Sequence, residues 1–149
     1  MSIFPTKILL ATDGSQEATL AARTAVDLAQ KTASELHVVH ARPVAPLFSY
    51  SAAETLTTSE IDEEEVRKRF QGFLDEQVER VKAEGGSVAQ AHLRIGRPDR
   101  EIVAVAEEID AGLIVMGSRG LGEMRKALMG SVSDSVVRNA HCPVLMVRK

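Results

Sequence analysis

Four of the ten glycines of the chain fall between positions 117 and 133, in the stretch GSRGLGEMRKALMGSVS. This stretch follows the apolar run LIVM of residues 113–116 and ends at the start of a helical pattern. Anions bind both at the carboxyl end of a buried strand and at the N–H groups that open a helix. Glycine allows close approach of a ligand to the backbone. The spacing therefore predicts that two glycine-containing segments contact one phosphate chain from opposite sides. These segments are Gly117 to Gly120 and Gly130-Ser131-Val132-Ser133.

Other phosphate-binding and catalytic motifs do not fit this stretch. A Walker A loop needs a lysine at the position of Glu123, and a dinucleotide fingerprint needs a third glycine after Gly120-Leu121-Gly122. The sequence has no G-x-S-x-G nucleophile elbow, and its four histidines lack the helical spacing of a zinc protease. His37 and His40 are expected to point to opposite faces of a strand.

Two interpretations of the basic and hydroxyl residues stay open. Arg119, or the pair Arg125 and Lys126, could add positive charge to a phosphate site, or the pair could simply be solvated. Ser131 could hold phosphate, or it could cap the helix in an arrangement like a capping box with Asp134 three residues later.

Length and composition favour one soluble domain. The chain has 149 residues, of which 44% are hydrophobic, 26% charged and only 3% aromatic, so the core must consist of Ala, Val, Ile and Leu. A formal charge of −3 offers no basic field to nucleic acid or to an anionic membrane. The lone Cys142 excludes an internal disulfide framework, and the first apolar run is too short for a signal peptide. We therefore expect a cytoplasmic protein without nucleic-acid or membrane partners.

Apolar runs of strand length alternate with helical patterns along the chain. Strands are expected at residues 7–12, 36–41, 88–95, 113–116 and 143–148, and helices after Ser15, at 66–81, at 98–109 and at 132–139. The alternating Gln90, His92 and Arg94 favour a sheet edge for the third strand. Alternating strands and helices build a parallel sheet that helices cover on both faces. The pattern predicts one α/β domain over residues 1–149, in which residues 43–59 form a lid or a disordered surface loop.

The sequence resembles the universal stress protein family over its whole length. The resemblance rests on KILLATDGS at the start, LHVVH, GRPDREIVAVAEE, LIVMGSRG, the glycine-2x-glycine-9x-glycine-serine element, and HCPVLMVRK at the end. It implies a Rossmann-like, adenine nucleotide α-hydrolase-like fold with an open five-stranded parallel sheet in the order 3-2-1-4-5. Because the glycine element is complete, the resemblance also implies the branch of the family that binds ATP.

The resemblance assigns the ATP site residue by residue. Thr12 and Asp13 end the first strand, with Asp13 beside adenine and ribose, and Ala41 touches adenine. Met116 and Gly117 lie beside the nucleoside, Arg119 and Gly120 beside sugar and phosphates, and Gly130, Ser131, Val132 and Ser133 hold the phosphates. Mg²⁺ or Mn²⁺ would arrive with the nucleotide, without a dedicated protein cage. Asp13 could instead serve an Asx turn or a helix cap with Gly14-Ser15.

The resemblance and the residues leave three classes of function open, and the resemblance also implies an oligomeric state. The resemblance implies a homodimer through the last strand, residues 143–148, which would otherwise be an unpaired edge. The favoured function is an ATP-binding regulatory protein of the stress response that acts on an unidentified protein partner. The first alternative is a slow ATPase or an autophosphorylating phosphotransferase that uses Ser131 or Ser133 as acceptor. The second is a structural module that binds no nucleotide.

Overall fold

A computed structural model describes residues 2–43, 63–118 and 130–148. In chain order its elements are β1 (Lys7–Ala11), α1 (Gln16–Thr32), β2 (Glu35–Arg42), α2 (Glu63–Ala83), β3 (Gln90–Ile95), α3 (Pro98–Ile109), β4 (Leu113–Gly117), α4 (Ser131–Asn139) and β5 (Val144–Val147). The strands form one parallel sheet in the order β3-β2-β1-β4-β5. The fold class predicted from the sequence is confirmed. The predicted loop at 43–59 lies outside the described residues except for Pro43.

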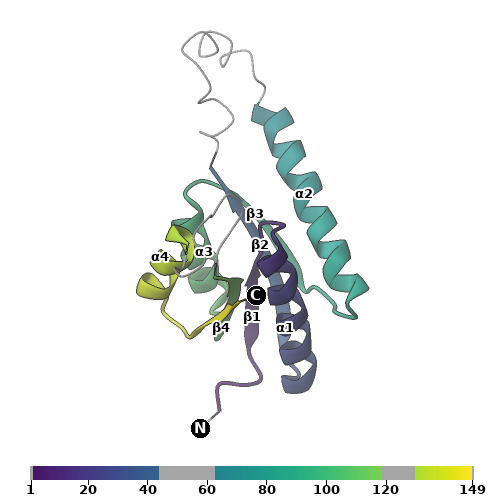
Figure 1. Cartoon of the computed structure of the whole chain (residues 1–149), viewed down its shortest axis with the longest axis vertical. Helices are drawn as coiled ribbons and strands as arrows, with labels where there is room; N and C mark the ends of the chain where they lie inside the picture. The colour runs from purple at the N-terminus through teal and green to yellow at the C-terminus, as the bar shows by residue number, and fades with distance from the viewer. Residues whose placement is uncertain (1, 44–62, 119–129, 149) are drawn as a thin grey trace.

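The helices form a layer on each face of the sheet (Figure 1). Helices α1 and α2 pack on the face that presents Ile8 and Leu10 of β1, and α3 and α4 pack on the face that presents Leu9 and Ala11. Each of Ile8, Leu9 and Leu10 has no exposed surface, since β1 lies between β2 and β4. Full burial of such a side chain contributes about 1.5–3 kcal/mol. The apolar run near the N-terminus is therefore the centre of both cores.

Helix α1 begins where the sequence places it. The hydroxyl oxygen of Ser15 accepts a hydrogen bond from the N–H of Ala18 at 3.1 Å and caps the helix. The buried face of α1 is mostly alanine, with Ala21 and Ala25 fully buried. Because alanine has only a methyl group, α1 lies close against the end of β4.

The two edges of the sheet are β3 and β5. The edge position of β3 confirms the expectation from its polar alternation, although His92 is buried and stacks on His37 with 5.6 Å between ring centroids. His37 and His40 do point to opposite faces, because His37 stacks on His92 whereas His40 contacts Phe73 of α2. The other edge, β5, is half-buried along its whole length.

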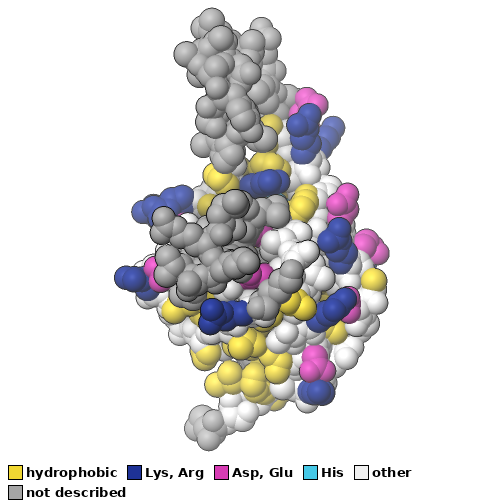
Figure 2. All heavy atoms as spheres, in the orientation of Figure 1, with side chains coloured by type: hydrophobic (Ala, Val, Ile, Leu, Met, Phe, Trp, Pro, Cys, Tyr) yellow, Lys and Arg dark blue, Asp and Glu magenta, His cyan; other side chains and the backbone are white. Residues whose placement is uncertain are grey.

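The surface carries mixed charge. On the face shown in Figure 2, the Lys and Arg side chains of the described residues are distributed over the surface, with acidic groups among them. Among the described residues there is no helix long and apolar enough to cross a lipid bilayer.

The connections leave the sheet in opposite directions after β1 and β4, which are neighbours. From β1 the chain enters α1 on one face, and α4, the next described element after β4, lies on the other face. Such a switch point leaves a crevice at the carboxyl ends of the strands. The fold therefore brings the ends of β1, β2 and β4 together at one place.

Asp99 joins the two helices of the second layer. Its carboxylate accepts hydrogen bonds from Arg97 (2.8 and 3.1 Å) and from the hydroxyl of Ser135 in α4 (2.8 Å). The Arg97 guanidinium above all, and the Ser135 hydroxyl, lower the pKa of Asp99 to about 2. Since the folded-state pKa lies below the unfolded value, this stabilisation is present above about pH 4 and is lost as the pH falls toward 2.

We predict that Asp99→Asn lowers the free energy of unfolding at neutral pH by about 1 kcal/mol and makes stability less dependent on pH in the acid range. Urea unfolding at neutral pH and near pH 3 measures both effects. Asp134→Asn is the control, because Asp134 pairs with Arg138 at 3.0 Å on an exposed surface, where such pairs contribute about 0.5 kcal/mol. Equal effects of the two substitutions would contradict the role of Asp99.

Candidate functional site

A cavity of about 240 Å³ lies at the carboxyl ends of β1, β2 and β4. Its apolar wall comes from the strand ends and from α3, with Ala11, Ala41, Met116 and Ile102. Its polar wall comes from the turn after β1 and from the beginning of α4. The cavity therefore offers an apolar surface on one side and the backbone at the start of α4 on the other.

Most residues that the sequence assigned to a site lie around this cavity. Those that line it are Thr12, Asp13, Ala41, Met116, Gly117, Gly130, Val132 and Ser133. Ser131 is not among the lining residues, although it stands between two that are. Arg119 and Gly120 lie outside the described residues, as do Arg125 and Lys126.

Other lining residues were not found from the sequence. They are Ala11, Ser15, Ala18, Val39, His40, Arg42, Pro98 and Ile102. His40 and Arg42 could have been found from the sequence, because they lie at the carboxyl end of a predicted strand and the carboxyl ends of parallel strands meet at the same edge of the sheet. Pro98 and Ile102 had no such signal, because only the packing of α3 on the sheet brings them to the cavity.

Hydrogen bonds hold the turn from Thr12 to Ser15 in place. A carboxylate oxygen of Asp13, Oδ1, accepts the N–H of Ser15 at 2.9 Å, which is an Asx turn. The N–H of Thr12 donates to the carbonyl of Val39 at 3.1 Å. The Asx turn that the sequence left open is thus formed, and Asp13 still lines the cavity, half-buried.

His40 supports the same turn from β2. Its Nδ1 lies 3.0 Å from the carbonyl oxygen of Thr12, and since a carbonyl only accepts, Nδ1 is the donor. Burial is the largest influence on His40 and lowers its pKa. The imidazole is therefore neutral at pH 7, with its proton on Nδ1.

Helix α4 begins at Ser131, and its N-cap is Gly130. Of the two roles that the sequence left open for Ser131, the helix cap is not formed: Ser131 is the first helical residue and is exposed, and Asp134 pairs with Arg138. A glycine cap has no side chain to satisfy the first N–H groups, which also lack acceptors within the helix. With the helix dipole, these groups favour an anion at this end of the cavity.

Ser118 holds this helix start in place. Its carbonyl accepts the N–H of Gly130 at 2.8 Å and the hydroxyl of Ser133 at 2.5 Å, and its own hydroxyl donates to Glu17 at 2.6 Å. The buried hydroxyl of Ser133 thus donates its one proton to the backbone carbonyls of Ser118 and Gly130. Only the backbone N–H of Ser133 is suited to donate to an anion in the cavity.

Fold and cavity together define the class of the molecule: a doubly wound α/β protein with a ligand cavity at the switch point of its sheet. The chain belongs to the universal stress protein family, since the model of that family matches residues 5–148. It is similar to "Universal stress protein MJ0531" of Methanocaldococcus jannaschii, with 34% identity over 143 residues that cover 96% of this chain and 82% of the relative. The resemblance seen in the sequence is confirmed.

Two similar solved structures are complexes with nucleotides. One is a universal stress protein in complex with cAMP, with a TM-score of 0.67, 25% identity, and coverage of 99% of this chain and 98% of that chain. The other is the universal stress protein from Archaeoglobus fulgidus in complex with dAMP, with a TM-score of 0.65, 25% identity, and coverage of 97% and 99%.

Gly117 is needed where β4 meets α1. A Cβ at this position would lie 2.9 Å from Cβ of Glu17 and 3.1 Å from its backbone carbonyl carbon. We predict that Gly117→Ala lowers the free energy of unfolding by about 1–3 kcal/mol, because the first turn of α1 would have to move. Denaturant unfolding of the purified variant measures this loss.

Gly72→Ala is the matched control. A Cβ at Gly72, in α2, meets nothing within 4 Å, so this change is expected to stabilise the helix by about 0.5–1 kcal/mol. If Gly117→Ala were as well tolerated as Gly72→Ala, the close contact between β4 and α1 would be disproved.

Proposed function

We propose that the cavity binds an adenine nucleotide, with ATP as the preferred ligand, and that the protein is an ATP-dependent regulator of a stress response. The observation that carries this proposal is the uncapped start of α4, which faces the same cavity as the apolar strand ends. A nucleotide has a flat base and an anionic phosphate chain, and the cavity has one wall for each. The cAMP and dAMP complexes of similar proteins support an adenine nucleotide.

The base would lie against the apolar wall. Ala11 and Ala41 are small and leave room beside a planar ring, while Ile102 and Met116 supply larger apolar contacts. Asp13 lies at the end of β1 and would accept hydrogen bonds from the ribose hydroxyls or the exocyclic amine. This arrangement places the sugar between the two walls.

The phosphates would lie at the start of α4. Gly130 allows close approach there, and the backbone N–H groups of Ser131, Val132 and Ser133 are the donors. In the described part of the chain, no group of three or more His, Cys, Asp or Glu side chains could hold a metal ion. We therefore assign Mg²⁺ or Mn²⁺ to the phosphates of the bound nucleotide, where it would neutralise their charge. Arg119 and Gly120 remain part of the proposed phosphate site.

Binding with slow turnover fits this site better than efficient catalysis. Phosphoryl transfer needs a group that orients or deprotonates the nucleophile. Among the described residues that line the cavity, Asp13 is the carboxylate, and in the arrangement proposed above it lies beside the sugar rather than beside the phosphates at the start of α4. We therefore propose that occupancy of the site, rather than hydrolysis, is the signal. Cys142 is a free thiol, in keeping with the cytoplasmic location that we also propose.

We predict that Ser131→Asp weakens nucleotide binding at least tenfold without loss of stability. A carboxylate in the first turn interacts favourably with the helix dipole but repels phosphate, so affinity and stability should move in opposite directions. Calorimetric titration of the nucleotide-stripped protein with Mg-ATP is expected to give micromolar binding for the parent, about −8 kcal/mol, and at least a tenfold loss for the variant.

Asn139→Asp is the control for net charge. It adds one negative charge at the opposite end of α4, where it is expected to leave the affinity for Mg-ATP unchanged. Absence of binding by the parent protein would refute the proposed function. Equal losses for both variants would show a general charge effect and would argue against a phosphate site at the start of α4.

We also propose that the protein forms a homodimer through β5. The carbonyls of Pro143 and Val147 accept hydrogen bonds from Ile114 of β4 and from Ser118, which follows it. The backbone groups of the alternating residues Val144 and Met146 therefore point to the open edge. A second copy could pair there, as edge strands tend to do.

Met146→Pro removes an N–H from this open edge and keeps the bonds to β4. We predict that the parent sediments as a dimer at micromolar concentration and that the variant sediments as a folded monomer, with folding checked by circular dichroism. A monomeric parent would end the dimer proposal, and a dimeric variant would move the interface to another surface.

A further inference from the structure

Helix α2 contacts the turn from Thr12 to Ser15 directly. The hydroxyl of Thr12 donates to Oε1 of Gln77 at 3.2 Å, although the two residues are 65 positions apart, and both are buried. The other buried residues of α2 are apolar: Val66, Phe70, Leu74 and Val81. A polar side chain in a buried stripe costs free energy unless it is hydrogen-bonded. The contact with Thr12 provides that hydrogen bond.

Phe73 of α2 lies against the same turn. Gly14 has a φ of +82°, and a Cβ on it would come within 2.8 Å of Cζ of Phe73. The ring therefore lies in contact with the backbone of the turn. A displacement of α2 would change the space available to Gly14, and a displacement of the turn would press on Phe73.

His40 and Arg42 complete the connection from β2. The ring of His40, which donates to the carbonyl of Thr12, lies 4.4 Å from the ring of Phe73 between centroids. The guanidinium of Arg42 lies over the rings of Phe70 and Phe73 at 5.4 and 5.9 Å. The turn, the end of β2 and the middle of α2 thus form one contiguous set of contacts beside the cavity.

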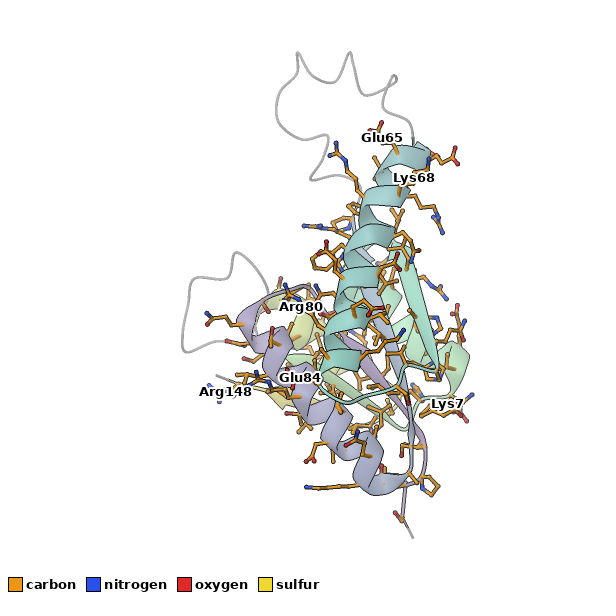
Figure 3. All side chains as sticks on the ribbon, turned by 90° about the vertical axis from the view of Figure 1, so that its right-hand side faces the viewer. Lys7, Glu65, Lys68, Arg80, Glu84 and Arg148 are labelled. Carbon is orange, nitrogen blue, oxygen red and sulfur yellow. The ribbon has the colours of Figure 1, made fainter. Side chains whose placement is uncertain are left out.

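We propose that α2 is the element through which this protein reports the occupancy of its nucleotide site; the inference rests on the function proposed above. A ligand that orders Thr12 and Asp13 also favours the position of α2 in which Gln77 and Phe73 hold the turn. Coupling of this kind is reciprocal, so a group that holds α2 raises the affinity for nucleotide by the same factor. The outer face of α2, on which Glu65 and Lys68 project into solvent (Figure 3), is the surface whose order changes.

Gln77→Met tests the coupling, because it keeps the length of the side chain and removes the acceptor for Thr12. Val81→Ala is the matched control, because Val81 lies on the same buried stripe of α2 and is 1% exposed. Val81 packs in the core between the sheet and α1, where it contacts Gly86 rather than the turn. Both variants are expected to lose stability. Phe73→Leu serves as the second test variant if Gln77→Met does not fold.

Hydrogen exchange and calorimetry are measured on parent and variants, with and without Mg-ATP. In ligand-free Gln77→Met, we expect faster exchange of the amides of residues 12–18, which include the N–H of Ser15, and at least a fivefold lower affinity for Mg-ATP. In the parent, Mg-ATP is expected to slow exchange in α2. Val81→Ala should change neither the turn nor the affinity.

The outcomes separate this inference from the proposed function. Binding of Mg-ATP by the parent without protection of α2 would overturn the inference and leave the function standing. The same loss of affinity in Gln77→Met and Val81→Ala would show that α2 only supports the fold, and it would also overturn the inference. No binding by the parent would refute the function, and with it the reporting role of α2, whatever the exchange of the turn.

Discussion

The carbonyl group of Ser118 is the acceptor on which the geometry of the site depends. It receives the N–H of Gly130 and the hydroxyl of Ser133, and so fixes the first turn of α4 to the end of β4. The N–H of Ser118 donates to Val147 of β5, and its hydroxyl donates to Glu17 of α1. Ser118 is 5% exposed, so each of these groups would be costly to leave without a partner. One residue therefore sets where the unpaired N–H groups of α4 point.

The small side chains of the chain make this junction possible. Gly117 lets the first turn of α1 approach β4 closely enough for Glu17 to reach Ser118. The alanine face of α1 keeps the helix near the sheet along its length. The aromatic content of 3% is thus a requirement of the packing as well as a feature of the composition. Larger residues at the contact would move α1 outward and break the hydrogen bond between Glu17 and Ser118.

The sheet could be predicted because its signals are local. The apolar run at the start of the chain indicated a strand buried on both faces, and the polar alternation of Gln90, His92 and Arg94 indicated an edge. The glycine spacing, with the family resemblance, predicted half of the residues that line the cavity. All of these signals lie within a few residues of the feature that they predict.

The contacts that position the cavity could not be predicted, because they join distant parts of the chain. Glu17 and Ser118 are 101 residues apart, and nothing near either residue indicates the other. The burial of Gln77 did have a signal in the sequence: it stands three residues after Leu74 and four before Val81, a spacing that puts all three on one face of a helix. Because glutamine is polar, it was not counted as part of the apolar face. The start of α4 was placed one residue late, since Ser131 has the chemistry of a cap and Gly130 has its conformation.

The two sides of the cavity are held by interactions of different strength. At the start of α4, the buried Ser118 makes four hydrogen bonds, to Gly130, Ser133, Glu17 and Val147, and each contributes about 1 kcal/mol. At the turn after β1, α2 is held by a neutral hydrogen bond to Thr12, worth about 1 kcal/mol, and by aromatic contacts. The start of α4 is therefore held firmly, whereas the contact between the turn and α2 is easier to change. The smaller free energy needed to move α2 relative to the turn is the physical reason why a response to binding would appear in α2 before it appeared in α4.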